Sequence, residues 1–422
     1  MEMNRSILVG IVLASILLGC ASSNELSKED LIATYGSARL DLAPEIHVFH
    51  HSKDSTEISI RFNSENLLYS RREDDEYAAN VEIVLEPVSG QTESGKVLEK
   101  TIYKVPDILR KHQGKDVLAS AMIELPFGAM YDVEITIKDR SSGKRYNQLI
   151  RTYKDSPNNR NNFSTSESDN PLPVFSDRIK PEKTYEIAFS LSDTVTRVYV
   201  NYYDRSFPLP PPPFTFYEPK PFDFNPDDQF VLESSEGKFN LSSRKKGFYH
   251  FRIDTSIVDG YSLFISADEF PEVQEVRNML EPFRYLVSGK EYKSILEAPD
   301  LKTEIERYWI DWAGDQGRAR NSIKAYYSRV ELANKHFSSH LEGWKSDRGL
   351  IYLVYGKPDK IYRTAELETW IYGEERNPLS LTFRFLKVEN PFTNNDYRLN
   401  REDYFKPSWY RSIEAWRNGR VY

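Results

Sequence analysis

Polar and apolar residues alternate along much of the segment 41–153. In "TEISIRF", residues 56–62, apolar side chains occupy every second position, and the same pattern returns in "NVEIVLE" (80–86) and "YDVEITIKD" (131–139). A period of two is typical of a strand that buries one face in a core. Short strands that recur at intervals of roughly 8–12 residues predict an immunoglobulin-like β-sandwich over residues 41–153.

A polar stretch and a second β-rich segment follow. Residues 154–172, "KDSPNNRNNFSTSESDNPL", have the Ser, Asn, Asp and Pro content of a linker. Alternating stretches between residues 173 and 270, among them "KTYEIAFSLS" and "GFYHFRID", predict a second β domain.

The second β domain is interrupted by "SFPLPPPPFTFYEPKPF", residues 206–222, which we call the proline loop. Its four consecutive prolines impose an extended polyproline II conformation. One interpretation is a docking segment for an aromatic groove of a partner protein. The other is a rigid loop packed on its own domain, anchored by Phe214, Phe216, Tyr217 and Phe222.

After about residue 270 the hydrophobic period changes from two to 3.6. "DLKTEIERYWIDWAG" predicts a helix with Asp300 as its N-cap and Gly314 as its end. A second helix is predicted over about 317–338, because its apolar residues recur at i, i+3, i+4 and i+7.

Three apolar stretches after the helices predict strands. "GLIYLVYG" (349–356) is almost wholly apolar, which favours a central strand covered on both faces. "LETWIYG" (367–373) and "LSLTFRFLK" (379–387) alternate. Helices followed by an antiparallel meander predict an α+β domain over residues 271–422, closed by an aromatic C-terminal helix. The predicted fold class is therefore multi-domain and β-rich, with Ig-like sandwich modules followed by this α+β domain.

Glycine, tryptophan and charged residues are concentrated in "HLEGWKSDRGLIYLVYGKPDKI", residues 340–361. The pattern predicts a helix-to-strand hinge, in which a glycine with positive φ releases the chain from the helix and the tryptophan covers the core. The acid and its arginine neighbour could instead hold a ligand. We treat the motif as structural or partner-binding, with the residues Gly343, Trp344, Ser346, Asp347, Arg348 and Gly349.

This segment resembles the GWxTD domain, with Ser346 in place of the usual threonine. The flanks "YYSRVELANKHFS" (326–338) and "DRGLIYLVYGKPD" (347–359) are also similar to that family, and the resemblance covers about 270–422. It implies an exported bacterial protein, since many members are lipoproteins of Bacteroidetes. It implies no catalytic residue, because none is established for the family.

The N-terminus has the features of a lipoprotein signal peptide over residues 1–19. The apolar stretch Ile7–Leu18 is shorter than the about 20 residues of a membrane span. "LLGC" resembles the lipoprotein box, in which the cysteine becomes the acylated first residue. Cys20 is the only cysteine, so acylation with chains such as palmitate explains it better than a disulfide does. Residues 20–40 are the predicted tether.

Position 21 is alanine. An aspartate there would resemble an inner-membrane retention signal, so the alanine favours the outer membrane. Whether the protein faces the periplasm or the cell surface stays open. The charge balance, 56 Lys and Arg against 64 Asp and Glu for a net charge of −8, argues against a nucleic-acid partner.

Signatures of catalysis are missing from the sequence. It contains neither a GxSxG elbow nor a phosphate-binding loop. His336 and His340 have a spacing that can hold a metal, with Glu342 or Asp347 as a third ligand, and "HVFHH" (47–51) is a second candidate of the same standing. Structural roles explain these histidines better, so we predict no catalytic residue, no metal and no cofactor.

Together these features predict a lipid-anchored outer-membrane protein with a non-catalytic interaction or scaffold role. Its partner would be another protein of the cell envelope, in an assembly, secretion or transport complex. The alternative is an envelope hydrolase or glycan-binding protein with a site near the GWKSD turn. A third hypothesis is an attachment protein on the cell surface.

Overall fold

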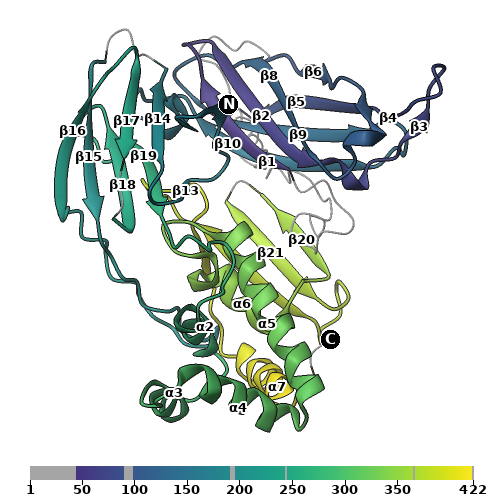
Figure 1. Cartoon of the computed structure of the whole chain (residues 1–422), viewed down its shortest axis with the longest axis vertical. Coiled ribbons are helices and arrows are strands. Elements are labelled where there is room, and N and C mark those ends of the chain that lie inside the picture. Colours follow the sequence, from purple (N-terminus) through teal and green to yellow (C-terminus); the bar gives the residue numbers. More distant parts are fainter. Residues whose placement is uncertain (1–43, 90–97, 191–194, 243–244, 365, 421–422) are drawn as a thin grey trace, which may run out of the picture.

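The computed structural model describes residues 44–89, 98–190, 195–242, 245–364 and 366–420. The predicted signal peptide, tether and acylated Cys20 lie outside these residues, so the structure does not test them. None of the helices within the described ranges is long and apolar enough to cross a membrane. Figure 1 shows two β modules side by side above a third module of helices and strands.

The first module is a sandwich of two antiparallel sheets. The strands of its first sheet are, in order, β1 (Glu45–His50), β2 (Ser55–Asn63) and β8 (Asp116–Glu124). Those of the second are β10 (Arg145–Tyr153), β9 (Met130–Asp139), β5 (Val81–Ser89) and β6 (Thr101–Lys104). A small ladder at one end joins β3 (Ser70–Arg71), β4 (Tyr77–Ala79) and β7 (Ile108–Leu109).

The core of this sandwich consists of the residues that alternate in the sequence. Ile58 and Ile60 from one sheet and Ile83 and Ile135 from the other are at most 1% exposed. The hydroxyl of Tyr131, at the start of β9, donates to the carbonyl of Pro126 over 2.6 Å. Such a tyrosine corner is typical of immunoglobulin-like sandwiches, and the predicted sandwich is confirmed.

The second module is also a sandwich and contains a matching corner, in which the Tyr249 hydroxyl donates to the Lys245 carbonyl. One sheet has the order β12 (Asn170–Pro173), β11 (Phe163–Glu167), β14 (Thr184–Phe189) and β17 (Lys238–Ser242). The other has the order β13 (Arg178–Ile179), β19 (Tyr261–Ile265), β18 (Gly247–Arg252), β15 (Arg197–Tyr203) and β16 (Asp228–Glu233).

The prediction of a linker over 154–172 is wrong for its second half, which forms β11 and β12 of the second sandwich. In β11, Phe163 and Thr165 are buried, Ser164 lies between them and Ser166 follows them. Small polar residues gave the strand the composition of a loop. The connection between the sandwiches is therefore short and includes the 3-10 turn η3 (Arg160–Asn162).

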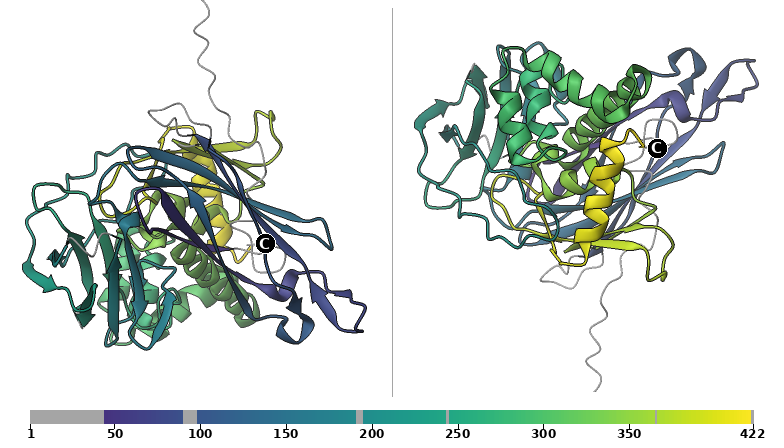
Figure 2. Two further views of the ribbon diagram at one scale, coloured as in Figure 1. Left: turned by 90° about the horizontal axis from the view of Figure 1, so that it is seen from above. Right: turned by 90° about the horizontal axis from the view of Figure 1, so that it is seen from below.

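The third module combines helices with one antiparallel sheet (Figure 2). Its helices are α2 (Val276–Phe283), α3 (Gly289–Leu296), α4 (Leu301–Ala313), α5 (Gln316–Phe337), α6 (Asp347–Tyr355) and α7 (Phe405–Arg417). The sheet order is β20 (Lys360–Arg363), β21 (Leu367–Tyr372), β22 (Leu381–Lys387) and β23 (Tyr397–Leu399). As predicted, Asp300 caps α4 and Gly314 ends it with φ 75°.

The prediction of a strand at "GLIYLVYG" is wrong, because these residues form most of helix α6. The hydroxyl of Ser346 caps the helix by accepting from the amide of Gly349 over 3.0 Å, and Gly356, with φ 81°, ends it. The helix is buried on all sides. A short, wholly apolar stretch does not distinguish a buried helix from a buried strand, and here the caps decide.

Aromatic residues join the second sandwich to the third module. Phe392, from the loop before β23, packs against Phe248 and Tyr203 with ring centroids 5.1 and 5.8 Å away. The proline loop also crosses between these modules: its Phe214 contacts Tyr410 of α7 at 5.7 Å. The loop thus packs on its own chain, though on the third module as well as on its parent sandwich.

The tyrosine corner of the first sandwich predicts that Tyr131→Phe has a measurably lower free energy of unfolding than the wild type. This change removes one buried hydrogen bond, which contributes about 1 kcal/mol. Hydrogen exchange of the β9 amides reports on this module and should show less protection. Tyr77→Phe is the matched control, because Tyr77 is 41% exposed. Unchanged protection in Tyr131→Phe would contradict the role of the corner.

Candidate functional site

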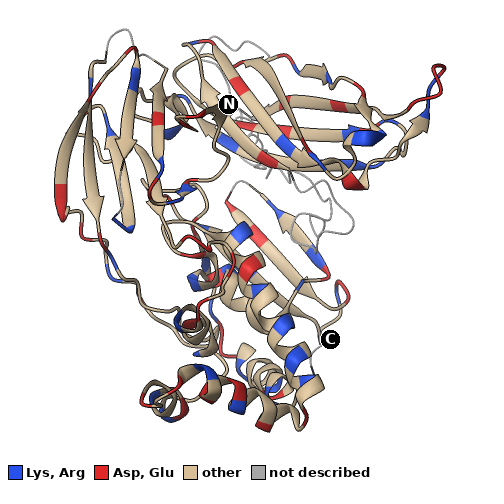
Figure 3. Cartoon of the chain, viewed as in Figure 1, with Lys and Arg blue, Asp and Glu red and all other residues tan. Residues whose placement is uncertain are grey.

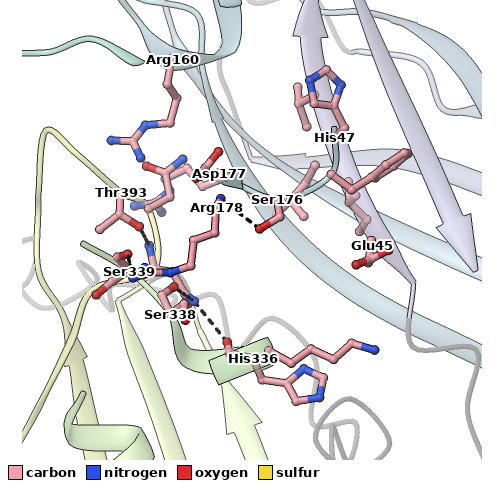
Figure 4. Close-up of a pocket in the computed structure, with 18 of the residues that line it drawn as sticks. Glu45, His47, Arg160, Ser176, Asp177, Arg178, His336, Ser338, Ser339 and Thr393 are labelled. Atoms are coloured by element: carbon pink, nitrogen blue, oxygen red, sulfur yellow. Dashed lines mark hydrogen bonds between the residues drawn. The ribbon is translucent and has the colours of Figure 1, made fainter. Parts of the chain in front are cut away.

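A cavity of about 860 Å³ lies where the three modules meet (Figure 4). β1 and β10 of the first sandwich form one wall, residues 174–178 of the second sandwich form another, and the end of α5 with the loop 392–395 forms a third. This volume is within the range of about 300–1,000 Å³ that is typical of ligand pockets.

The first sandwich contacts the third module through Arg151 of β10. Its Nη1 lies 2.8 Å from Oε1 of Glu366, and its Nε lies 2.8 Å from Oδ1 of Asp132 in the neighbouring strand. Asp132 is buried and Glu366 is exposed. The inner pair orients the guanidinium, so that its free edge reaches the other module.

Arg160 of η3 makes a second connection to the third module. Its Nη2 donates to the carbonyls of Asn390 and Pro391 at 3.0 and 3.1 Å. Burial lowers the pKa of this arginine, since its partners in these bonds are neutral carbonyls. The carboxylates of Asp177, Asp259 and Glu389 attract this charge, but within the described residues none of them forms an ion pair with Arg160.

Arg178 of β13 makes the third connection. Its Nη2 donates to the carbonyls of Ser339 and Leu341, at 3.1 and 2.5 Å, directly before the GWKSD turn. Its guanidinium also lies over the rings of Phe264 and Phe270, at 5.1 and 4.9 Å. Burial lowers the pKa of Arg178 to about 10. Its Nε is buried and makes no hydrogen bond to the described part of the chain.

Asp177 lies between these two arginines along the cavity wall (Figure 4). Its side chain is exposed and lines the cavity. Desolvation by the surrounding protein raises its pKa, against the opposing effect of Arg160 and Arg178. Sequence reasoning did not single out any of these three residues, because only the tertiary fold brings them together.

The residues of the predicted motif do not line this cavity; they are buried and form hydrogen bonds and ion pairs inside the protein. Asp347 forms a two-pronged ion pair with Arg401, at 2.6 and 3.0 Å, and accepts from the amide of Leu399 at 2.8 Å. Arg401 also donates to the carbonyl of Pro211 and lies 4.7 Å from the ring of Tyr217. Asp347 thus connects α6 to β23 and, through Arg401, to the proline loop.

Arg348 is the centre of a second buried network. Its Nη1 lies 3.3 Å from Oε2 of Glu368, which also accepts from Arg363 at 2.7 Å. The other oxygen of Glu368 accepts from the indole of Trp370 at 2.7 Å. Burial acts to raise the pKa of Glu368, but attraction to the two arginines outweighs it and holds the pKa below its usual range.

The structure explains the glycines of the motif differently from the prediction. Gly343 does not have positive φ. A Cβ on it would lie 1.8 Å from the carbonyl oxygen of Ala333 in α5, and a Cβ on Gly349 would lie 2.0 Å from that of Gly343. The motif therefore joins two helices in close backbone contact, through the 3-10 turn η4 (Gly343–Lys345), and is not a helix-to-strand hinge.

The alternatives to a structural role gain little from the geometry. Across the residues that the structure describes, no three His, Cys, Asp or Glu side chains are grouped to hold a metal ion. His340 lies 3.2 Å from the amide of Asn390. Trp344 and Trp370 are 2% and 0% exposed, so neither ring is available to stack on a sugar.

The fold and the site define a β-rich protein of several modules whose last module encloses a buried GWKSD turn. Residues 247–418 match the GWxTD domain family, and the chain therefore contains a GWxTD domain. The match begins at the first residue of β18, inside the second sandwich, which is earlier than the predicted limit at 271. A comparison with curated proteins gives no match.

The buried ion pair of the motif predicts a large effect of Asp347→Asn. The change leaves Arg401 buried without its counter-charge, a loss of about 3–5 kcal/mol. All six tryptophans lie in the GWxTD domain, so their fluorescence during urea unfolding measures this domain alone. Asp403→Asn, at an exposed position before α7, is the control. Equal stability of the two variants would contradict the structural role of Asp347.

Buried histidines predict sensitivity to acid. Burial lowers the pKa of His47 and His336 to about 4 and that of His250 to about 3, from 6.5 in the unfolded chain. Below pH 6.5 the unfolded chain takes up protons that the folded protein does not, so stability is full above pH 6.5 and decreases toward pH 4. The thermal midpoint of the wild type should fall as the pH is lowered through this window. The decrease should be less steep in His250→Gln and as steep as in the wild type in the control His112→Gln, at an exposed position. A midpoint that is flat from pH 7.5 to 5 would exclude the effect.

Proposed function

We propose that the protein is a lipid-anchored component of the outer membrane that binds another envelope protein and catalyses no reaction. It would act as an accessory subunit of an assembly, secretion or transport complex. The anchor rests on the sequence, where Cys20 follows an apolar segment of signal-peptide length. The interaction role rests on one surface, which is formed by the proline loop and by α7 of the GWxTD domain.

Exposed aromatic side chains occur on two segments that contact each other, the proline loop and α7 with the residue that precedes it. Phe216 is 70% exposed, Tyr410 56% and Tyr404 49%. We call these three residues the aromatic surface. Large aromatic side chains are enriched at protein interfaces because they bury much area at little cost in conformational entropy. This exposure is the observation that supports the proposal most directly.

The motif contributes to this surface through Arg401. Arg401 holds the proline loop at Pro211 and Tyr217, and Asp347 fixes the guanidinium from inside the domain. The amide of Glu402 also donates to the carbonyl of Pro213 at 3.2 Å. A loop that is held in place before binding loses less entropy when a partner docks, which favours affinity. A buried motif and an exposed contact surface are therefore compatible.

Co-purification tests the interaction role. From detergent-solubilised membranes, the wild-type chain should retain a stoichiometric partner, and the double variant Phe216→Ser, Tyr410→Ser should lose at least about 90% of it, because anchor aromatics contribute about 2 kcal/mol or more each. Leu296→Ser, at a residue of α3 that is 54% exposed, is the matched control. Equal recovery by all three chains, or no stoichiometric partner, would count against the proposal.

Acylation is tested by Cys20→Ala. The wild-type protein should incorporate a labelled fatty acid and partition into the detergent phase, since buried acyl chains contribute about 0.8 kcal/mol per CH₂. Cys20→Ala should remain in the aqueous phase, while Ser22→Ala behaves as the wild type. Retention of Cys20→Ala in the membrane fraction would contradict the anchor. Protease treatment of intact cells then distinguishes surface from periplasmic exposure.

A further inference from the structure

The cavity between the three modules contains an excess of cations without counter-charges. Some of its charged side chains are paired, as Arg61 is with Glu45 and Arg151 with Asp132. Others have no oppositely charged side chain within 4.0 Å in the described part of the chain. These are one carboxylate, Asp177, and five cations: Arg160, Arg178, Lys180, Lys335 and Lys387.

This excess runs against the charge of the molecule. The whole chain has a net charge of −8, and Figure 3 shows acidic and basic positions interspersed over the modules. Like charges in an enclosed space repel one another more strongly than in bulk water. Burial lowers the pKa of Lys387, and Arg151 adds to this effect, while Glu389, Glu366 and Asp132 oppose it. A cavity lined by one sign of charge concentrates ions of the opposite sign.

The polar groups around these cations suit an oxygen-rich anion. Arg160 and Arg178 lie on one side of the cavity, and the hydroxyl groups of Ser338 and Thr393 lie near them (Figure 4). Nη1 of Arg178 donates to the hydroxyl of Ser266 and Nη2 donates to the carbonyls of Ser339 and Leu341, so this arginine contributes its positive charge to the cavity. Arginine and lysine donors form their strongest hydrogen bonds with carboxylate and phosphate oxygens.

We propose that this cavity binds a small anionic ligand that carries phosphate or carboxylate groups. Its volume of about 860 Å³ accommodates a molecule of metabolite size. All three modules contribute to the lining, so the ligand binds only when they are assembled as seen here and thereby stabilises that assembly. The inference does not depend on the aromatic surface or on the lipid anchor.

Lys335 and Lys387 are the best residues for a test. Neither side chain forms an ion pair or a hydrogen bond within the described ranges, so replacement by glutamine should preserve the fold. Lys324 on the same helix as Lys335 is exposed and lies outside the lining, which makes Lys324→Gln the matched control.

The experiment titrates the purified protein with inorganic pyrophosphate and with citrate at constant ionic strength, by calorimetry and by the shift of the thermal midpoint. At least one anion should bind saturably to the wild type and to Lys324→Gln, and each of Lys335→Gln and Lys387→Gln should weaken binding about tenfold. Binding of pyrophosphate alone would indicate a phosphate ester, and binding of citrate alone a carboxylic acid. Saturable binding of neither anion, or equal binding by all variants, would overturn the proposal.

A second measurement does not require variants. In the wild-type chain, the bound anion should slow the reaction of Lys335 and Lys387 with an amine-specific reagent, relative to that of Lys324. Equal labelling of the three lysines with and without saturating anion would also overturn the proposal.

Discussion

The hydrogen bonds from Arg178 to the carbonyls of Ser339 and Leu341 are the constraint on which the arrangement of the modules depends. β13, which carries this arginine, is paired with β19, and its partners lie directly before the GWKSD turn. Arg178 lines both the central cavity and a second one of about 640 Å³ beside Trp344. One side chain thus joins the second sandwich to the GWxTD domain and separates two cavities.

A buried guanidinium is costly unless its donors are satisfied, and neutral carbonyls offset only part of that cost. The rings of Phe264 and Phe270 offset more, because their faces attract cations. Phe392 closes the same junction through its aromatic neighbours in the second sandwich. The GWxTD match agrees with this close packing of the second sandwich on the third module, since the match includes β18 and β19 as well as the helices and the last sheet.

Features that depend on neighbours in sequence could be predicted. The strands around Ile58 and Ile83 follow from period two, and α4 follows from its 3.6 period and its caps. α6 could not be assigned from the sequence, because a segment that is buried on all sides lacks periodicity and a serine occurs in turns as well as at helix N-caps. β11 was missed because serines alternate with its buried residues, so that composition outweighed pattern.

The candidate site was less predictable than the fold. The sequence pointed to the glycines of the motif, yet the reason for them, close contact with the backbone of α5 and η4, exists only in the folded chain. Arg160, Asp177 and Arg178 come from a predicted linker and the short segment after it, and their role depends on residues more than 150 positions away in the case of Arg178. Local patterns contain no information on such contacts.

The distance between the second sandwich and the GWxTD domain tests the role of Arg178 most directly. Cys20 is the only cysteine, so Cys20→Ala removes the native labelling site. Asp169→Cys and Lys324→Cys, both at exposed positions, then introduce one pair of sites for spin labels. Pulsed electron paramagnetic resonance should give one narrow distance distribution for this chain and a broad one after Arg178→Met, with both domains still folded by hydrogen exchange. A distribution that stays narrow after Arg178→Met would contradict the claim that this arginine fixes the modules.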